Sequence, residues 1–197
     1  MLEHCNIVYI NLAHRTDRRA EVENELDKIG ATDWTRFEAI PDADGAIGCS
    51  MSHLAVLETY VPTKDLLMIM EDDCEFIVDR KEIDDVIRHF VLSSASVLCL
   101  AYNARQFSPI DEKIQRAYNV QTHGCYVMKP SIRPIIKSTF VDSISMLQQG
   151  MRRNLSCGDR VWFREQERYI WAVPINRAAR QRASYSDIEK RMVDYGV

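Results

Sequence analysis

One short stretch restricts what this chain can fold into: five apolar residues, 66–70, run directly into the carboxylates Glu71, Asp72 and Asp73. An unbroken apolar run of this length indicates a strand that is buried on both faces, as in the parallel sheets of α/β proteins. Three adjacent like charges at the end of such a strand are unfavourable unless a cation shares them. Ligands of open α/β sheets bind at the carboxyl ends of strands, and carboxylate oxygens suit Mg²⁺ or Mn²⁺. The stretch therefore predicts a site for a metal ion and a phosphate; the alternative is a solvated acidic turn after an ordinary strand.

Strands and helices alternate through the first half of the chain. The residue pattern predicts strands over 5–12, 34–40, 66–70 and 96–101, and helices over 16–30, 47–60 and 81–92. This alternation predicts an α/β fold, a single domain with a mostly parallel, Rossmann-like sheet flanked by helices. In the second half we expect a polar loop over 102–115, strands within 117–128, helices over 130–140 and 142–155, a strand over 169–173 and a short helix over 186–195.

Length and composition narrow the class of protein. The 197 residues fit one domain, the 46% of hydrophobic residues support a sizeable core, and a net charge of −4 gives no electrostatic reason to expect a nucleic acid or an anionic membrane as partner. No apolar run approaches the roughly 20 residues that cross a bilayer, and the N-terminus shows no signal-peptide pattern. The six scattered cysteines lack a C-x-x-C pair, which argues against a zinc site and fits reduced core residues. We therefore expect a cytoplasmic protein.

Two further segments carry residues suited to an anionic ligand. Arg15, Arg18 and Arg19 follow the first strand at the start of a predicted helix, where positive charge opposes the helix dipole unless an anion binds there. The alternative is a solvated arginine cluster.

Gly48 and the pair 52–53 (Ser-His) begin the next helix, where glycine permits close approach of a ligand and histidine can donate to a phosphate or sugar. The alternative is an ordinary helix with a hydrogen-bonded histidine.

No G-x-G-x-x-G follows the first strand and no G-x-x-x-x-G-K occurs, which excludes a dinucleotide fingerprint and a P-loop. The motifs that do occur are INL at 10–12, Arg15 with RR at 18–19, FEA at 37–39, AIGC at 46–49, SH at 52–53 and MEDD at 70–73. In this order and at this spacing they resemble glycosyltransferase family 25, the lipooligosaccharide and collagen-type galactosyltransferases. The resemblance covers about residues 7–75 and continues more weakly through GCYVM at 124–128 and GD at 158–159.

The resemblance implies a GT-A type fold, a UDP-sugar donor and Mn²⁺ or Mg²⁺ as cofactor. Its metal-binding D-x-D element corresponds to Glu71 and Asp73. Residues 1–101 would form the nucleotide-sugar-binding half and 102–197 the acceptor-side half and C-terminal tail of a single domain, which can belong to a longer chain. The residues implied to hold the nucleotide sugar are Asn11, Leu12, Arg15, Arg19, Ala39, Gly48, Ser52, His53, Asp72 and Gln181.

The family is an inverting one, and inversion needs a carboxylate that deprotonates the acceptor hydroxyl. Asp159 matches the family's later aspartate and is expected to be this base, with Asp142 as the second candidate. The alternative for Asp159 is a helix N-cap.

The C-terminal part departs from the family pattern. Metal sites of this kind often take a histidine from near the C-terminus, but no histidine follows His123, so Gln181, Ser184 or water would substitute. The tail carries three arginines that either close over the diphosphate or are solvated: Arg177, Arg180 and Arg182.

These observations predict an inverting, metal-dependent glycosyltransferase that moves a hexose from a UDP-sugar, UDP-galactose or UDP-glucose, to a glycan, lipooligosaccharide or glycoprotein acceptor. One alternative is a catalytically inactive nucleotide-sugar-binding or scaffold domain. Another is a receiver-like α/β domain with a phospho-acceptor aspartate, which is disfavoured because a receiver takes its acidic residues from separate strands.

Overall fold

The computed structural model describes residues 1–186, 191–194 and 196, and its centre is one mixed sheet. Within these residues the sheet has eight strands in the order β2-β1-β3-β8-β5-β9-β7-β6. All of them except β7 and β8 run in the same direction. The strands are β1 (Cys5–Asn11), β2 (Trp34–Glu38), β3 (Leu66–Glu71), β5 (Val97–Asn103), β6 (Gln106–Pro109), β7 (Ile114–Tyr118), β8 (Gln121–Met128) and β9 (Trp171–Pro174).

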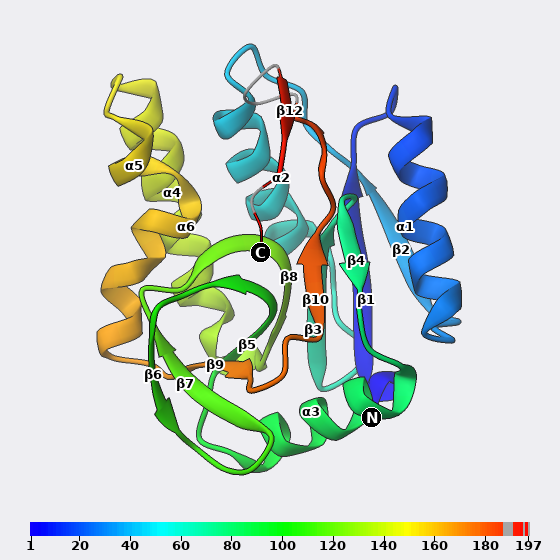
Figure 1. Ribbon diagram of the computed structural model, residues 1–197. Coiled ribbons are helices and arrows are strands. Elements are labelled where there is room, and N and C mark those ends of the chain that lie inside the picture. Colours follow the sequence, from blue (N-terminus) through cyan, green and yellow to red (C-terminus); the bar gives the residue numbers. More distant parts are fainter. Residues whose placement is uncertain (187–190, 195, 197) are drawn as a thin grey trace.

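Helices cover both faces of this sheet, and alternate side chains of each central strand pack against opposite layers. On one face, Tyr9 and Met68 pack in a core with α1 (Thr16–Lys28) and α3 (Arg80–Leu92). On the other face, Val8 and Ile69 pack with α2 (Gly45–Thr59), α4 (Arg133–Gln148) and the 3₁₀ helix η3 (Trp162–Glu167). Figure 1 shows α1 and α4 on opposite sides of the molecule with the strands between them. The α/β fold with a helix-flanked, Rossmann-like sheet is thus confirmed.

Short elements complete the chain. The 3₁₀ helices η1 (Leu2–His4) and η2 (Pro130–Ile132) precede β1 and α4, and the single-turn helices α5 (Arg153–Ser156) and α6 (Gly158–Val161) follow α4. Two small sheets pair β4 (Cys74–Phe76) with β10 (Ala179–Gln181), and β11 (Ser184–Ser186) with β12 (Arg191–Val193). All six cysteines are free. None of the helices in the described part of the chain combines the length and the apolar character needed to cross a bilayer.

The predicted strands and helices of the first half are confirmed to within a few residues, but three predictions further along are wrong. Residues 102–115 are not a loop, because 106–109 and 114–118 form an antiparallel hairpin, whose outer strand β6 is largely exposed and lacks an apolar pattern. The helix predicted over 142–155 is interrupted after Gln148, and Gly150 has a left-handed φ of 76° that a continuing helix does not allow. The helix predicted over 186–195 is contradicted at 191–193, which is a strand; residues 187–190 and 195 lie outside the described part.

The topology brings the chemistry-bearing residues to one edge of the sheet. Since β1 and β3 are parallel neighbours, Asn11 and Glu71 end side by side. Strand β8 is antiparallel to β3 and places Cys125 opposite Met70, so His123 lies near the same edge. The buried strand β3 therefore delivers its carboxylates between the end of β1 and the start of β8.

The packing of α3 on the sheet can be tested within one helix. Ile87 is fully buried, whereas Leu92, at the end of the same helix, is 80% exposed. We expect Ile87→Ala to lower the free energy of unfolding by about 2–5 kcal/mol, because it leaves a cavity in the core. Leu92→Ala should change it by less than about 0.5 kcal/mol. Urea denaturation followed by circular dichroism measures both, and equal losses would contradict this packing.

Candidate functional site

Two adjoining cavities open where the carboxyl ends of β1 and β3 meet the start of β8. The first cavity, of about 270 Å³, is lined by residues from β1, the β2–α2 loop, α2 and the end of β3. The second cavity, of about 460 Å³, lies between α2, β8 and the short helices α5 and α6. Cys49, Glu71 and Gln181 line both cavities and so form the wall between them. The predicted site residues on the first cavity are Leu12, Ala39, Gly48, Ser52, His53, Glu71, Asp72, Asp73 and Gln181.

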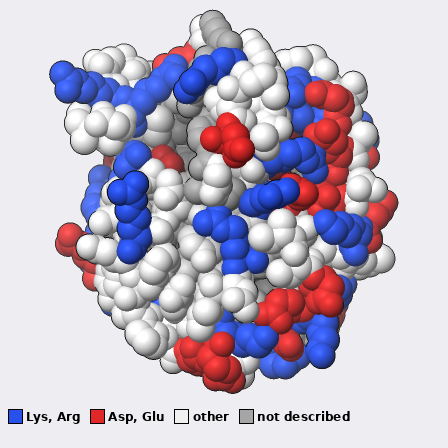
Figure 2. Space-filling view, in the orientation of Figure 1, with Lys and Arg blue, Asp and Glu red and all other residues white. Residues whose placement is uncertain are grey.

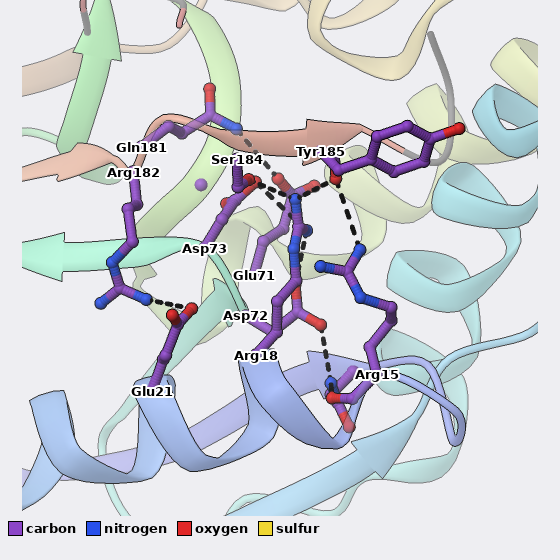
Figure 3. A network of polar contacts seen from close by, with 12 residues as sticks. Arg15, Arg18, Glu21, Glu71, Asp72, Asp73, Gln181, Arg182, Ser184 and Tyr185 are labelled. Carbon is purple, nitrogen blue, oxygen red and sulfur yellow. Dashed lines mark hydrogen bonds and ion pairs between the residues drawn. The ribbon is translucent and has the colours of Figure 1, made fainter. Parts of the chain in front are cut away.

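Asp72 and Asp73 are held by one arginine from α1, Arg18. Its Nη1 atom lies 2.9 Å from Oδ1 of Asp72 and 3.5 Å from Oδ2 of Asp73. The other oxygen of Asp72 accepts a hydrogen bond of 2.7 Å from the buried amide of Asn11. We refer to Glu71, Asp72 and Asp73 as the acidic group. Figure 3 shows Arg18 reaching from α1 into the acidic group. The charge of two carboxylates is thus partly offset by one guanidinium within a largely buried site.

The carboxylate of Asp73 has fewer hydrogen-bond partners than its two oxygens can accept. Its side chain is only 12% exposed, and its Oδ1 atom is buried without a hydrogen-bond partner among the described residues. Burial raises the pKa of Asp73 to about 7; nearby Glu71 also raises the pKa, whereas Arg18 lowers it. A buried carboxylate oxygen without a partner is costly, which is the condition under which a cation binds favourably.

The two carboxylate oxygens of Glu71 face different groups. Oε1 lies 3.3 Å from Nε2 of His53 and accepts a 3.4 Å hydrogen bond from the Cys49 thiol. Oε2 accepts a 3.4 Å hydrogen bond from the amide of Gln181. Burial raises the pKa of Glu71 and lowers the pKa of His53 to about 3, so the imidazole is neutral at physiological pH. Glu71 therefore connects the acidic group of the first cavity with α2.

Three predicted nucleotide-sugar residues lie elsewhere. Asn11 is buried below Asp72 and positions it. Arg15 pairs with Asp17 at the helix start and donates to the carbonyl of Tyr185. Arg19 is half exposed, pairs with Glu23 and lines neither cavity.

Arg18, which was not singled out for this role, is the arginine that reaches the site. No local signal separates it from Arg19, because Arg18 precedes the buried Val22 by four residues and Arg19 precedes it by three, and both spacings place side chains on one side of a helix.

Gly48 and Ser52 shape the wall formed by α2. The Ser52 hydroxyl donates to the carbonyl of Gly48 at 2.7 Å and accepts from the amide of Ile40 at 2.9 Å, which fixes the β2–α2 loop against the helix. A Cβ atom on Gly48 would lie 2.8 Å from the carbonyl oxygen of Ile40 and 3.2 Å from the amide of Asp42. Glycine is therefore needed here because two backbones approach closely.

Asp159 lines the second cavity together with Arg153 and Arg160. It lies inside α6, whose N-cap position is Cys157, so the alternative that Asp159 is an N-cap is wrong. Instead its Oδ2 atom accepts a 3.1 Å hydrogen bond from the amide of Thr122, whose φ of 76° is unusual for a β-branched residue.

Asp142, the second candidate base, lies on α4, where its side chain is 44% exposed and pairs with Arg164.

The C-terminal segment, residues 179–186 and 191–193, crosses the acidic group. The amide of Arg182 donates to the carbonyl of Asp73 at 2.7 Å, and Arg18 donates to the hydroxyl of Ser184 at 2.5 Å (Figure 3). The arginines in and just before this segment have other partners: Arg182 pairs with Glu21, Arg180 pairs with Glu75, and Arg177 stacks on Tyr102. The segment thus covers the site mainly through its backbone and Gln181.

Substitution of Gly48 tests the shape of the first cavity. In an ordinary helix interior, Gly→Ala raises stability by about 1 kcal/mol. Here we expect Gly48→Ala to lower the free energy of unfolding by about 1–3 kcal/mol, because the added methyl group must displace backbone atoms. Thermal unfolding measures the effect, with Glu58→Ala, an exposed substitution on the same helix, as the control. Stabilisation by Gly48→Ala would show that the two backbones are not in close contact.

Comparisons with solved structures show what this architecture is similar to. A glycosyltransferase involved in the glycosylation of the major capsid of PBCV-1 has a TM-score of 0.57 at 12% identity, over 94% of this chain and 96% of that chain. At this identity the likeness shows a shared fold. A mannose-1-phosphate geranyltransferase from Thermus thermophilus has a TM-score of 0.47 at 8% identity, over 91% of this chain and 74% of that chain.

Sequence comparison identifies the family. No curated protein sequence matches the chain. A model of glycosyltransferase family 25, described as an LPS biosynthesis protein, matches residues 41–152, more than half of the 197 residues. The matched part contains α2 with Gly48 and His53, the acidic end of β3 and the whole of β8. The chain is therefore a transferase that belongs to glycosyltransferase family 25.

Proposed function

We propose that this glycosyltransferase moves a hexose from a UDP-sugar, UDP-galactose or UDP-glucose, to a hydroxyl group of a glycan, lipooligosaccharide or protein acceptor, with inversion and with a divalent metal ion. One observation carries the proposal: the buried, unpartnered oxygen of Asp73 belongs to a residue that lines a cavity, and this cavity adjoins a second one containing Asp159. Two cavities that share a wall suit a reaction in which a group passes from one substrate to another.

The residues present fit a divalent metal ion. The unpartnered Oδ1 atom of Asp73 would hold Mn²⁺ or Mg²⁺, and the Oε2 atom of Glu71 would assist, since the hydrogen bond that it accepts from Gln181 is long, at 3.4 Å. Hard oxygen ligands suit both ions. When bound, such an ion neutralises charge on the diphosphate leaving group.

The first cavity suits a nucleoside diphosphate. Leu12, Ala39 and Ile40 give it an apolar side for the base, and the guanidinium of Arg18 lies on its acidic side, where it can meet a phosphate. Figure 2 shows several basic side chains in the upper half of this face, with an acidic one among them. A diphosphate is attracted to such a surface although the whole chain carries a net charge of −4.

Asp159 is proposed as the general base. Inversion requires the acceptor hydroxyl to attack the anomeric carbon from the side opposite the leaving group. The bond between this carbon and the acceptor oxygen forms as the bond to the UDP oxygen breaks, and the hydroxyl proton passes to the Asp159 carboxylate. The hydrogen bond from the Thr122 amide to Oδ2 orients this carboxylate in the second cavity.

We also propose a cytoplasmic location, which the free thiols of Cys49 and Cys157 beside the cavities support.

The alternative function, a donor-binding domain without catalysis, would use the same first cavity. The two functions differ in turnover and therefore in the role of Asp159.

Donor and metal binding can be measured by thermal stability with UDP, UDP-galactose or UDP-glucose, with and without Mn²⁺. A ligand at a hundredfold excess over its dissociation constant stabilises the folded state by about 2.7 kcal/mol. We expect this stabilisation to depend on Mn²⁺ in the wild type and to disappear in Asp73→Asn. Asp142→Asn, which alters a half-exposed carboxylate on α4 that lines neither cavity, should respond like the wild type. A Mn²⁺-dependent shift that persists in Asp73→Asn would overturn the assignment of the metal ligand.

Asp159→Asn separates catalysis from binding. We expect this variant to keep the stabilisation by UDP-sugar and Mn²⁺ but to lose sugar transfer by about 10²–10⁴-fold, the range that a general base contributes. The measurement is release of UDP in the presence of an acceptor sugar. A wild type that binds the donor but releases no UDP with any acceptor would favour the inactive domain, and equal turnover of the two proteins would exclude Asp159 as the base.

A further inference from the structure

Four side chains with metal-binding atoms meet in the wall between the two cavities. Cys49 and His53 come from one face of α2, Glu71 from the end of β3, and His123 from β8. One potential ligand atom from each of the four lies within 4.8 Å of those of the other three. We refer to these residues as the histidine–cysteine cluster. Asp72 and Asp73, the acidic residues held by Arg18, are not part of it.

An unpartnered nitrogen in this cluster indicates a ligand. His123 is only 6% exposed, and its Nε2 atom is buried without a hydrogen-bond partner among the residues that the structure describes. The ring lies among aromatic side chains, with ring centroids 5.0 Å from His53, 5.1 Å from Phe140 and 4.6 Å from Trp162. An imidazole nitrogen that is buried without a hydrogen bond loses its hydration without compensation, and coordination of a metal ion would supply that compensation.

The other members are oriented as metal ligands usually are. The Nδ1 atom of His53 lies 3.0 Å from the hydroxyl of Tyr126, and its Nε2 atom points to Oε1 of Glu71. A metal-bound histidine typically has its second ring nitrogen fixed in this way by an outer partner. The Cys49 thiol also points to Oε1 of Glu71. One sulfur, two imidazole nitrogens and one carboxylate oxygen form a donor set that suits Zn²⁺ better than Mg²⁺ or Mn²⁺.

We propose that Cys49, His53, Glu71 and His123 bind one zinc ion in the wall between the cavities, separate from the divalent ion of the donor site. The ion binds the thiolate of Cys49, whose proton passes to solvent, and the lone pairs of the two neutral imidazoles. Glu71 supplies Oε1 here, whereas Oε2 faces Gln181. Four protein ligands leave no open position, so the zinc is structural and joins α2 to β3 and β8.

Cysteine spacing could not indicate this site, because its four ligands come from three separate segments with only one cysteine among them. The sequence-based expectation that the chain lacks a zinc site concerned paired cysteines. Both cavities reach Cys49 and Glu71, which gives an ion a path from solvent.

The test is zinc binding by the full chain without nucleotide. Protein freed of metal with a chelator is titrated with Zn²⁺ in competition with a chromogenic chelator, and we expect one ion per chain. Cys49→Ser and His123→Ala should each weaken binding by more than the roughly 10–100-fold that loss of an outer partner costs, and Tyr126→Phe by an amount within that range. Cys157→Ser is the matched control, because this thiol also lines the second cavity but lies outside the cluster, and it should bind zinc as the wild type does.

Cobalt gives a second readout, whose first result, the spectrum of the wild type, does not depend on any variant folding. Co²⁺ bound to the wild type should show the near-ultraviolet charge-transfer absorption of a thiolate ligand, which Cys157→Ser should keep and Cys49→Ser should lose. Absence of this absorption in wild type, or less than one zinc bound per two chains, would overturn the proposal. Asp73→Asn should lose the response to UDP and Mn²⁺ but keep the zinc, so failure of the donor site and failure of the zinc site are distinguishable.

Discussion

The burial of adjacent carboxylates at the end of a central strand is the constraint on which this structure depends. Strand β3 carries Asp72 and Asp73 to a place where they are 9% exposed or less, and such charges are unfavourable without compensation. The neighbouring elements supply it: α1 supplies Arg18, and β1 supplies Asn11. The geometry of the site is therefore determined by how α1 and β1 pack against the end of β3.

Much of this arrangement could be predicted from the sequence. The apolar run at 66–70 predicted the central strand, and the alternation of strand-like and helix-like segments in the first half predicted a sheet flanked by helices. The loop after the first strand and the acidic end of the strand at 66–70 were both placed at carboxyl ends of strands, and residues of both, Leu12 and Glu71, line the first cavity. These features depend on local patterns or on one general rule of topology, which a sequence displays directly.

The remainder depends on contacts between distant segments. Arg18 was not distinguished from Arg15 and Arg19, because only the rotation of α1 against the sheet decides which arginine faces inward. His123 approaches Glu71 because β8 runs antiparallel between β3 and β5, an order that the spacing of elements does not reveal. The hairpin at 106–118 was missed because its edge strand β6 has largely exposed side chains and lacks the apolar period of a buried strand.

The segment that crosses the acidic group, residues 179–186 and 191–193, has a consequence for the order in which this protein becomes competent. Ser186 and Val193 contribute to the wall of the first cavity, and the backbone amide of Arg182 binds the carbonyl of Asp73. During synthesis, the strands that carry Asn11 and Glu71 leave the ribosome more than a hundred residues before this segment does. The carboxylates therefore lack this cover until the segment emerges, and the wall of the first cavity is incomplete in the nascent chain before then.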